Sequence, residues 1–211
     1  MVAPTASEIL LVGDSLTVGE SASAVDRTFA SRVITACTRP APMPPPMSRV
    51  AAISGARVRH LLARAPSAGL DLVIVELGTN DWVGWQPRGP SPPTPIGRFA
   101  DVYGRLLGRV VGPGARLVCL GVWGPTAGCT QQGARLADYD AAIAVQCRAR
   151  GGAFVVLSHV YDDGRSRGPA GRPTPFGVSD DGHPNDVGHR LVADIVLATV
   201  SRLVAPVAGP G

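Results

Sequence analysis

The sequence contains no lysine, so all 20 of its basic residues are arginines, and its formal net charge is +4. These arginines are spread along the chain rather than gathered in one block. A nucleic-acid-binding protein is expected to show a clustered basic face or a recognisable binding motif. Neither feature is present, and we expect no nucleic-acid partner.

Long apolar runs are also absent. No run approaches the ~20 apolar residues that a membrane-spanning helix needs, and the N-terminus lacks a basic region followed by an apolar one. Strand-like sequence begins by Glu8. We therefore expect no membrane span and a cytoplasmic location, with a mature secreted form, its signal removed, as the alternative.

Cysteine is scarce, and aromatic residues make up only 5% of the chain. None of the cysteines, Cys37, Cys119, Cys129 and Cys147, stands at metal-ligand spacing. Four cysteines allow three pairings if they are oxidised. We expect reduced, structural thiols.

The chain is long enough to bury a core. Its 211 residues, 45% hydrophobic and 17% charged, suit one domain over residues 1–211. Apolar runs rich in Val, Ile and Leu predict strands at Ile9–Val12, Val50–Ile53, Leu70–Leu77, Ala115–Val122 and Phe154–Leu157. Helical patterns occupy Val25–Ala36, Arg57–Ala65, Ile96–Val111, Ala134–Arg150 and Val187–Val204.

This alternation of strand and helix predicts an α/β fold in which helices cover both faces of a parallel sheet. Such sheets place their ligand sites at the carboxyl ends of the strands.

Three proline- or glycine-rich stretches interrupt the pattern. Residues 39–47 predict a stiff loop rather than a polyproline ligand, and 84–95 and 162–177 are long loops suited to lids or substrate walls. We expect 162–177 to determine specificity.

Polar residues stand where three of the predicted strands end. They are Gly13-Asp14-Ser15, Ser54-Gly55 and the stretch from Gly78 to Trp82, and a fourth polar group, Asp180 to Asn185, precedes the last helix. In a parallel sheet these segments emerge on one rim, so residues distant in sequence are expected to meet there.

That rim carries the groups that nucleophilic catalysis needs. A serine hydroxyl such as that of Ser15 needs a base to take its proton, and His183 is the candidate. Asp180, three residues earlier, can hold the other imidazole nitrogen. The backbone N–H groups of Ser15 and Gly55 and the side-chain amide of Asn80 can form an oxyanion hole.

These segments resemble the four sequence blocks of the SGNH hydrolase (GDSL esterase/lipase) superfamily. The matching motifs are GDSL at 13–16, SG at 54–55, GTND at 78–81 and DDGHPN at 180–185, in the family's order. The resemblance implies a flavodoxin-like three-layer α/β/α sandwich with a five-stranded parallel sheet. It also implies ester hydrolysis that needs neither a metal nor another cofactor.

The resemblance assigns the same roles to the same residues. Ser15 is the nucleophile, His183 the general base and Asp180 its partner, while Gly55 and Asn80 are oxyanion donors.

The G-x-S-x-G elbow of α/β-hydrolases is absent from the chain. The second block departs from the family pattern because Ala56-Arg57 follows Gly55. Arg57 is expected to be a solvated surface residue, and contact with an anionic substrate group is its alternative.

Alternatives exist at several of these positions. Ser15 could instead cap a helix, and Asp181 competes with Asp180. A metal bound by Asp180, Asp181 and His183 is a further, less favoured reading.

Other polar and aromatic residues have simpler interpretations. His60 is expected on a helix face, His159 near the rim as the most serious rival to His183, and His189 in packing or capping. Asp14 and Asp81 are interpreted as turn residues. Trp82, Trp85 and Trp123 could line an acyl or sugar site or pack in the core.

The predicted function is that of a serine esterase acting on carboxylic esters, with short acyl or O-acetyl groups on small molecules or carbohydrate favoured. An acyltransferase with the same triad and a non-catalytic binding module on the same fold are the alternatives. The sequence leaves the oligomeric state open.

Overall fold

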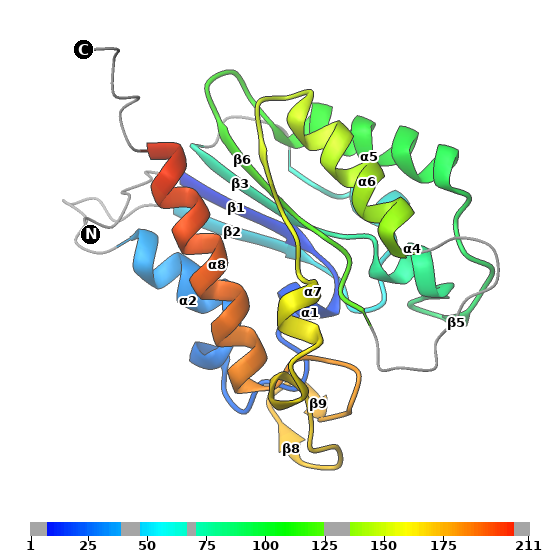
Figure 1. The fold of residues 1–211 in the computed structure, drawn as a ribbon, viewed down its shortest axis with the longest axis vertical. Coiled ribbons are helices and arrows are strands. Elements are labelled where there is room, and N and C mark those ends of the chain that lie inside the picture. Colours follow the sequence, from blue (N-terminus) through cyan, green and yellow to red (C-terminus); the bar gives the residue numbers. More distant parts are fainter. Residues whose placement is uncertain (1–7, 39–46, 67–70, 125–135, 205–211) are drawn as a thin grey trace.

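A five-stranded parallel sheet forms the centre of the computed structural model, which describes residues 8–38, 47–66, 71–124 and 136–204 (Figure 1). Its strands are β1 (Glu8–Gly13), β2 (Met47–Ala52), β3 (Leu72–Glu76), β6 (Arg116–Leu120) and β7 (Ala153–Val155). They lie in the order β2-β1-β3-β6-β7, and every neighbouring pair is parallel. Counted in chain order within this sheet, the order is 2-1-3-4-5, that of flavodoxin-like folds.

Helices cover both faces of this sheet, as the sequence predicts. The longer ones are α2 (Phe29–Cys37), α5 (Ile96–Val110), α6 (Leu136–Arg148) and α8 (Asp186–Val204), with the short helix α3 (Val58–Leu62) beside α5. In Figure 1, α5 and α6 lie on one side of the sheet and α2 and α8 on the other. The three-layer α/β/α sandwich is therefore confirmed.

The alternation of side chains along each strand divides the core in two. Leu10 and Val12 belong to the hydrophobic cluster beneath α3, α5 and α6, whereas Ile9 and Leu11 belong to the one beneath α2 and α8. Successive residues of a strand point to opposite faces, so a run without polar residues is what a strand covered on both sides requires. The edge strand β2 departs from this expectation, because its residues from Met47 to Val50 are exposed.

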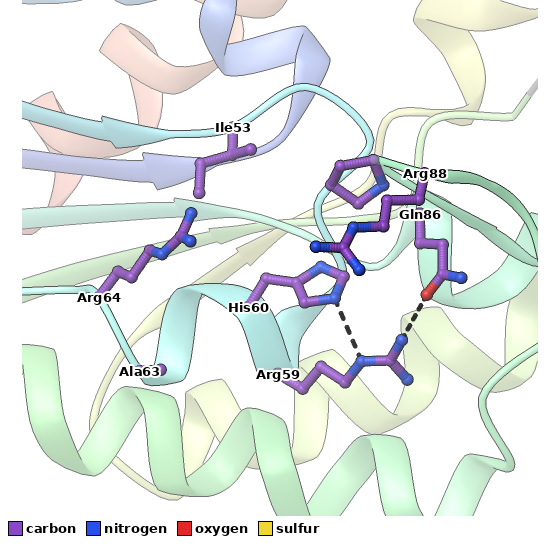
Figure 2. Close-up of a pocket in the computed structure, with 8 residues that line it drawn as sticks. Ile53, Arg59, His60, Ala63, Arg64, Gln86 and Arg88 are labelled. Carbon is purple, nitrogen blue, oxygen red and sulfur yellow. Dashed lines mark hydrogen bonds between the residues drawn. The ribbon is translucent and has the colours of Figure 1, made fainter.

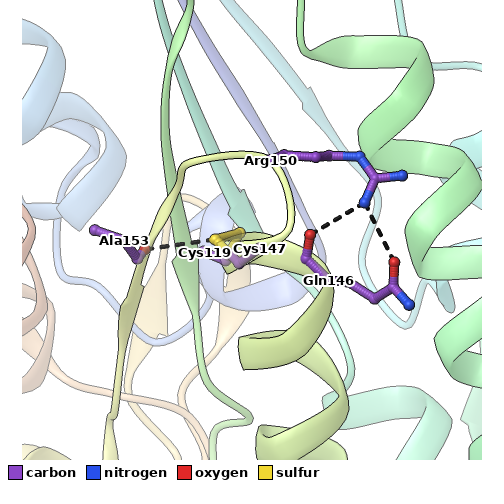
Figure 3. Close-up of a disulfide and its surroundings, with 5 residues drawn as sticks. All are labelled: Cys119, Gln146, Cys147, Arg150 and Ala153. Atoms are coloured by element: carbon purple, nitrogen blue, oxygen red, sulfur yellow. Dashed lines mark hydrogen bonds between the residues drawn. A yellow bond between two sulfur atoms is a disulfide. The ribbon is translucent and has the colours of Figure 1, made fainter.

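One disulfide crosses from the sheet to a helix. Cys119 on β6 is bonded to Cys147 on α6, 28 residues further on (Figure 3). The expectation of reduced thiols is therefore wrong for these two cysteines, since β6 and α6 pack directly against each other and bring them together. Cys37 is a buried free thiol. Disulfides persist in oxidising compartments, and the cytoplasmic location remains a prediction.

The predicted loops contain short ordered elements. Residues 84–95 include the hairpin β4 (Trp85–Gln86) and β5 (Gly89–Pro90). Residues 162–177 include η2 (Gly164–Ser166) and β8 (Pro173–Thr174), which pairs with β9 (Gly177–Val178). The proline-rich segment 39–46 lies outside the described residues. Among the helices that are described, none combines the length and apolarity needed to cross a bilayer.

Candidate active site

Ser15 lies at the first position of a short helix that begins directly after β1. This helix, α1 (Ser15–Val18), is capped by Asp14, whose Oδ1 accepts a hydrogen bond from the backbone N–H of Leu16 at 3.2 Å. Asp14 rather than Ser15 therefore supplies the cap. Gly13 makes this tight entry possible, because a Cβ there would lie 1.8 Å from Oγ1 of Thr17.

A continuous chain of hydrogen bonds links Ser15, His183 and Asp180. Oγ of Ser15 lies 2.8 Å from Nε2 of His183, and Nδ1 of His183 lies 2.7 Å from Oδ2 of Asp180. The other carboxylate oxygen of Asp180 accepts the backbone N–H groups of Gly182 and His183 at 2.8 and 2.7 Å. The turn before α8 thus fixes the carboxylate, and the carboxylate orients the imidazole.

The charges at this turn favour a protonated imidazole. Burial alone would lower the pKa of His183, but hydrogen bonding to Asp180 and the charges of Asp180, Glu20 and Asp14 outweigh it, and the net pKa is raised. Burial likewise opposes ionisation of Asp180, yet its bonds to His183 and Gly182 bring its pKa down to about 2. Asp180 is therefore a carboxylate throughout the physiological range, ready to stabilise an imidazolium.

Glu20 is a polar neighbour of His183 that the sequence analysis missed. Its Oε2 lies 3.2 Å from Nε2 of His183, and its Oε1 accepts a hydrogen bond from the Ser54 hydroxyl. Gly19 ends α1 with φ of 105°, and the chain then folds back so that the N–H of Glu20 donates to the Ser15 carbonyl at 3.0 Å. In the sequence, Gly19 directly before Glu20 is a local sign of this reversal of the chain.

The two other expected oxyanion donors, Gly55 and Asn80, line the same pocket as Ser15. Gly55 has φ of 70°, a left-handed conformation that glycine adopts readily. Asn80 lies on α4 (Thr79–Val83), and its Nδ2 donates to Oδ2 of Asp14 at 2.9 Å. That bond uses one of the two amide hydrogens, so the second remains available to the pocket.

Asp14 has a larger role than that of a turn residue, because it pairs with a second buried acid. Both Asp14 and Glu76 are about 1% exposed, and Glu76 accepts from Thr17 Oγ1 at 3.0 Å and from the Asp14 N–H at 3.4 Å. Burial raises the pKa of Asp14 to about 6, and burial together with the charge of Asp14 raises the pKa of Glu76 well above its usual value. Like charges this close disfavour double ionisation.

The rival residues of the sequence analysis lie elsewhere. His189 is buried, accepting from the N–H of Phe29 at 3.3 Å and stacking on its ring, so its packing role is confirmed. His159 lies on α7 (Ser158–Tyr161) and His60 on α3, and neither lines the pocket around Ser15. Asp181 accepts from the N–H of Ala170 at 3.1 Å and so holds the preceding loop.

The three tryptophans divide between core and pocket. Trp82 is packed in the core, whereas Trp85 is 45% exposed and lines the pocket. Trp123 is buried but also lines the pocket, and its Nε1 donates to the carbonyl of Gly182 at 2.7 Å. Trp123 therefore braces the turn that carries Asp180 and His183.

Arg57 is neither solvated nor free to contact a substrate, so both predictions for it are wrong. It is buried, and its guanidinium donates to the carbonyls of Trp85 and Ser91 at 2.6 and 3.1 Å. Asp81 beside it is not a simple turn residue either, since it accepts from Val58 N–H at 2.9 Å and Thr94 Oγ1 at 2.6 Å. Together these two residues tie the 84–95 segment to α3 and α4.

The pocket around Ser15 has a volume of about 580 Å³, a size typical of small-molecule sites. Its walls come from the segments after β1, β2, β3 and β6 and from the turn before α8. None of its lining residues, within the described chain, belongs to 162–177, whereas Trp85 of the 84–95 segment does line it. The specificity expected of 162–177 is thus not supported by the lining of this pocket.

Three of the polar groups could also serve as metal ligands. Ligand atoms of Glu20, Asp180 and His183 lie within 4.8 Å of one another. However, each ring nitrogen of His183 already has a protein partner, Asp180 on one side and Ser15 on the other. The arrangement fits proton transfer better than metal binding.

Comparison with known proteins identifies the family. Residues 11–191 match the family model described as the GDSL-like Lipase/Acylhydrolase family. The chain belongs to the GDSL-like lipase/acylhydrolase family. This SGNH hydrolase family typically contains carboxylic ester hydrolases. A search of curated protein sequences gave no match.

Solved structures share the fold of this GDSL-family chain at low sequence identity. Phospholipase A1 from Streptomyces albidoflavus NA297 has a TM-score of 0.64 and 16% identity, covering 92% of this chain and 100% of that one. A variant of the acetyl xylan esterase Axe2 from Geobacillus stearothermophilus has a TM-score of 0.65 and 16% identity, with coverages of 98% and 100%. A two-domain esterase active on acetylated mannans has a TM-score of 0.59 and 20% identity, and the match covers 96% of this chain but 50% of that one.

Proposed function

We propose that this protein is a serine esterase that hydrolyses carboxylic esters through an acyl-Ser15 intermediate. The observation that carries the proposal is the hydrogen-bonded chain from Ser15 Oγ through His183 to Asp180, at 2.8 and 2.7 Å. A serine hydroxyl becomes an effective nucleophile when a base of this kind is positioned to take its proton.

The reaction proceeds in two halves. His183 Nε2 takes the proton of Ser15 as Oγ attacks the ester carbonyl, and the imidazolium is stabilised by Asp180. The proton then passes to the departing alcohol, which leaves acyl-Ser15. Water, deprotonated by the same histidine, releases the acid and regenerates the hydroxyl.

Three donors are suited to the negative charge that develops on the carbonyl oxygen. They are the backbone N–H groups of Ser15 and Gly55 and the second hydrogen of the Asn80 amide. Asp14 holds this amide at 2.9 Å, so it is oriented before the substrate arrives. Donors already in place cost no reorganisation during the reaction, and this is the source of their effect.

We expect short acyl groups, in particular O-acetyl groups on small molecules or carbohydrate, to be preferred. The half-exposed indole of Trp85 at the pocket provides a face on which a sugar ring can stack. Two of the similar structures are esterases whose names refer to acetylated xylan or mannan, which agrees with this substrate class.

The first test is covalent labelling with a fluorophosphonate ester, followed by intact mass measurement. We expect one adduct on the wild type, none on Ser15→Ala and slower labelling of His183→Ala. Turnover of p-nitrophenyl acetate should exceed that of the octanoate. A folded wild type that forms no adduct and cleaves neither ester would overturn the proposal and favour a binding module. Transfer of acetate to added alcohols in preference to water would instead identify an acyltransferase.

A further inference from the structure

A second pocket, of about 490 Å³, lies beside the catalytic one and is lined by cationic side chains (Figure 2). Its charged residues are Arg59, Arg64 and Arg88, with His60 between them, and no acidic residue lines it. The lining residues come from the position just after β2, from α3 and the two residues after it, and from the β4–β5 hairpin. The proposed ester hydrolysis assigns no role to this pocket.

None of the three arginines of this pocket forms a salt bridge among the described residues, and the buried carboxylate of Asp81 acts on Arg59 only through its charge. Arg59 donates to the Gln86 side chain at 2.7 Å and to Nε2 of His60 at 3.2 Å, and both partners are neutral (Figure 2). Burial lowers the pKa of His60, and the charges of Arg59, Arg57 and Arg64 lower it further. The pocket is thus a concentration of positive charge that an anion would relieve.

Short stretches of chain form the wall between this pocket and the catalytic one. Ile53 lines the cationic pocket, while Ser54 and Gly55, the next two residues, line the catalytic pocket. On the facing hairpin, Trp85 lines the catalytic pocket and Gln86 the cationic one. Consecutive Cα atoms are 3.8 Å apart, so the two pockets are neighbours on both walls.

The shared wall is held firmly. A Cβ on Gly55 would lie 3.2 Å from the backbone N of Pro87 and from Cδ1 of Trp85, so the hairpin packs directly on the glycine. The buried Arg57 donates hydrogen bonds to the carbonyls of Trp85 and Ser91 and so anchors the hairpin. A positively charged pocket on an anchored wall can hold a ligand group in a fixed relation to the catalytic serine.

We propose that the cationic pocket binds a phosphate group carried by the ester substrate while the ester carbonyl lies at Ser15. This inference rests on the proposed esterase function and narrows its substrate class to anionic esters. Phosphate has several charged acceptor oxygens, which suit the forked donors of more than one arginine. The pocket volume accommodates a phosphate with the first part of a glycerol or sugar unit.

The test compares matched substrates that differ only in the phosphate. Acetate release is followed by titration for 1-acetylglycerol and for 1-acetylglycerol 3-phosphate. A third substrate, 1-lauroylglycerol 3-phosphate below its micellar concentration, distinguishes a lipid source of the phosphate from a small soluble one. The proteins are the full chain, the double variant Arg64→Gln/Arg88→Gln, and Arg148→Gln, which removes an exposed arginine from α6 outside both pockets.

We expect kcat/KM of the wild type to favour the phosphorylated acetate by about tenfold, the effect of one good charge-assisted contact. The double variant should bring this ratio close to one, chiefly through KM, and Arg148→Gln should keep the wild-type ratio. A wild type that cleaves both acetates equally, or a double variant that keeps the ratio, would overturn the inference. If neither acetate nor p-nitrophenyl acetate is cleaved, the proposed esterase function fails instead.

Discussion

His183 has two acidic neighbours that act on different ring nitrogens. Asp180 accepts from Nδ1, whereas Glu20 lies 3.2 Å from Nε2, the nitrogen that also contacts Ser15. Because Asp180 keeps the hydrogen of the neutral ring on Nδ1, Nε2 carries a hydrogen only in the imidazolium, and a carboxylate at Nε2 therefore interacts best with that form. Glu20 therefore helps to raise the pKa of His183, and a higher pH is needed before the imidazole is neutral and able to accept a proton.

This geometry predicts the pH dependence of the enzyme. The proposed mechanism needs neutral His183. Because the pKa of His183 is raised above 6.5, the acid limb of kcat/KM should have its midpoint above pH 6.5. Glu20→Gln removes a negative charge and should move that midpoint to lower pH, by up to about one unit. Asp162→Asn, a change to an exposed acid outside the pocket, should leave the profile in place. A flat profile between pH 5 and 8 would contradict His183 as the base.

Asn80 is the second residue whose replacement is expected to have a specific kinetic effect. Asn80→Ala removes one of the three proposed oxyanion donors, and kcat should then fall by about 10²- to 10³-fold. KM should change much less, because the bond forms mainly in the transition state. Steady-state kinetics with p-nitrophenyl acetate measure both constants. A proportional rise in KM with unchanged kcat would mean that Asn80 binds the ground state instead.

At the scale of elements, the β4–β5 hairpin is tied to the rest of the protein by a buried arginine. Its position relies on Arg57, which lies at the entry to α3 and reaches the carbonyls of Trp85 and Ser91. Burial lowers the pKa of this guanidinium, but the charge of Asp81 supports the protonated form. Without Arg57, the buried Asp81 would lose a compensating charge and two part-buried carbonyls would lose their donors.

Arg57→Met should therefore destabilise the protein by about 2–4 kcal/mol, the usual cost of unpaired buried polar groups. It should also raise KM, because Trp85 would no longer be held at the pocket. Arg148→Met, which changes an exposed arginine, should stay within about 0.5 kcal/mol of the wild type. Urea denaturation with parallel kinetics measures both effects. Wild-type stability in Arg57→Met would show that the hairpin is anchored by other contacts.

For the whole molecule, the acids buried next to the sheet determine how stability responds to pH. Glu76 ends β3, and with Asp14 it forms a carboxyl pair that burial makes hard to ionise. Because both pKa values are raised on folding, the folded chain holds protons that the unfolded chain releases. The contribution of this pair to the free energy of unfolding is fully present below about pH 4. The part due to Asp14 is lost as pH rises through about 6, and the part due to Glu76 is lost as pH rises through the raised pKa of that residue.

Glu76→Gln removes one of the two ionisations while keeping the shape of the side chain. We expect its Tm to exceed that of the wild type at pH 8 by several degrees, roughly 2–4 °C for each kcal/mol gained. At pH 5 the difference should shrink, since the wild-type pair is protonated there. Asp194→Asn, an exposed acid on α8, should show no such dependence. Equal Tm differences at both pH values would mean that the pair does not titrate in this range.

Much of the fold and of the site could be predicted from the sequence, because the deciding signals are local. The apolar runs from Ile9 and from Leu72 have no polar interruption, which is typical of strands covered on both faces. Glycine and polar residues after three of the strands mark the rim. Asp180 is three residues from His183, close enough to form its hydrogen bond within one turn. These features led to the family and to the residues that the structure brings together.

Only the tertiary structure decided which distant side chains meet. No local pattern encodes a contact between segments far apart in the chain. Such contacts place Glu20 beside His183, pair Asp14 with Glu76 and bury Arg57. The pairing of Cys119 with Cys147 likewise required β6 and α6 to be packed against each other. The sequence determined the kinds of groups that line the rim, since local propensity and periodicity act over a few residues. Their electrostatic surroundings were decided by packing, because burial and charge depend on everything that surrounds a residue in space.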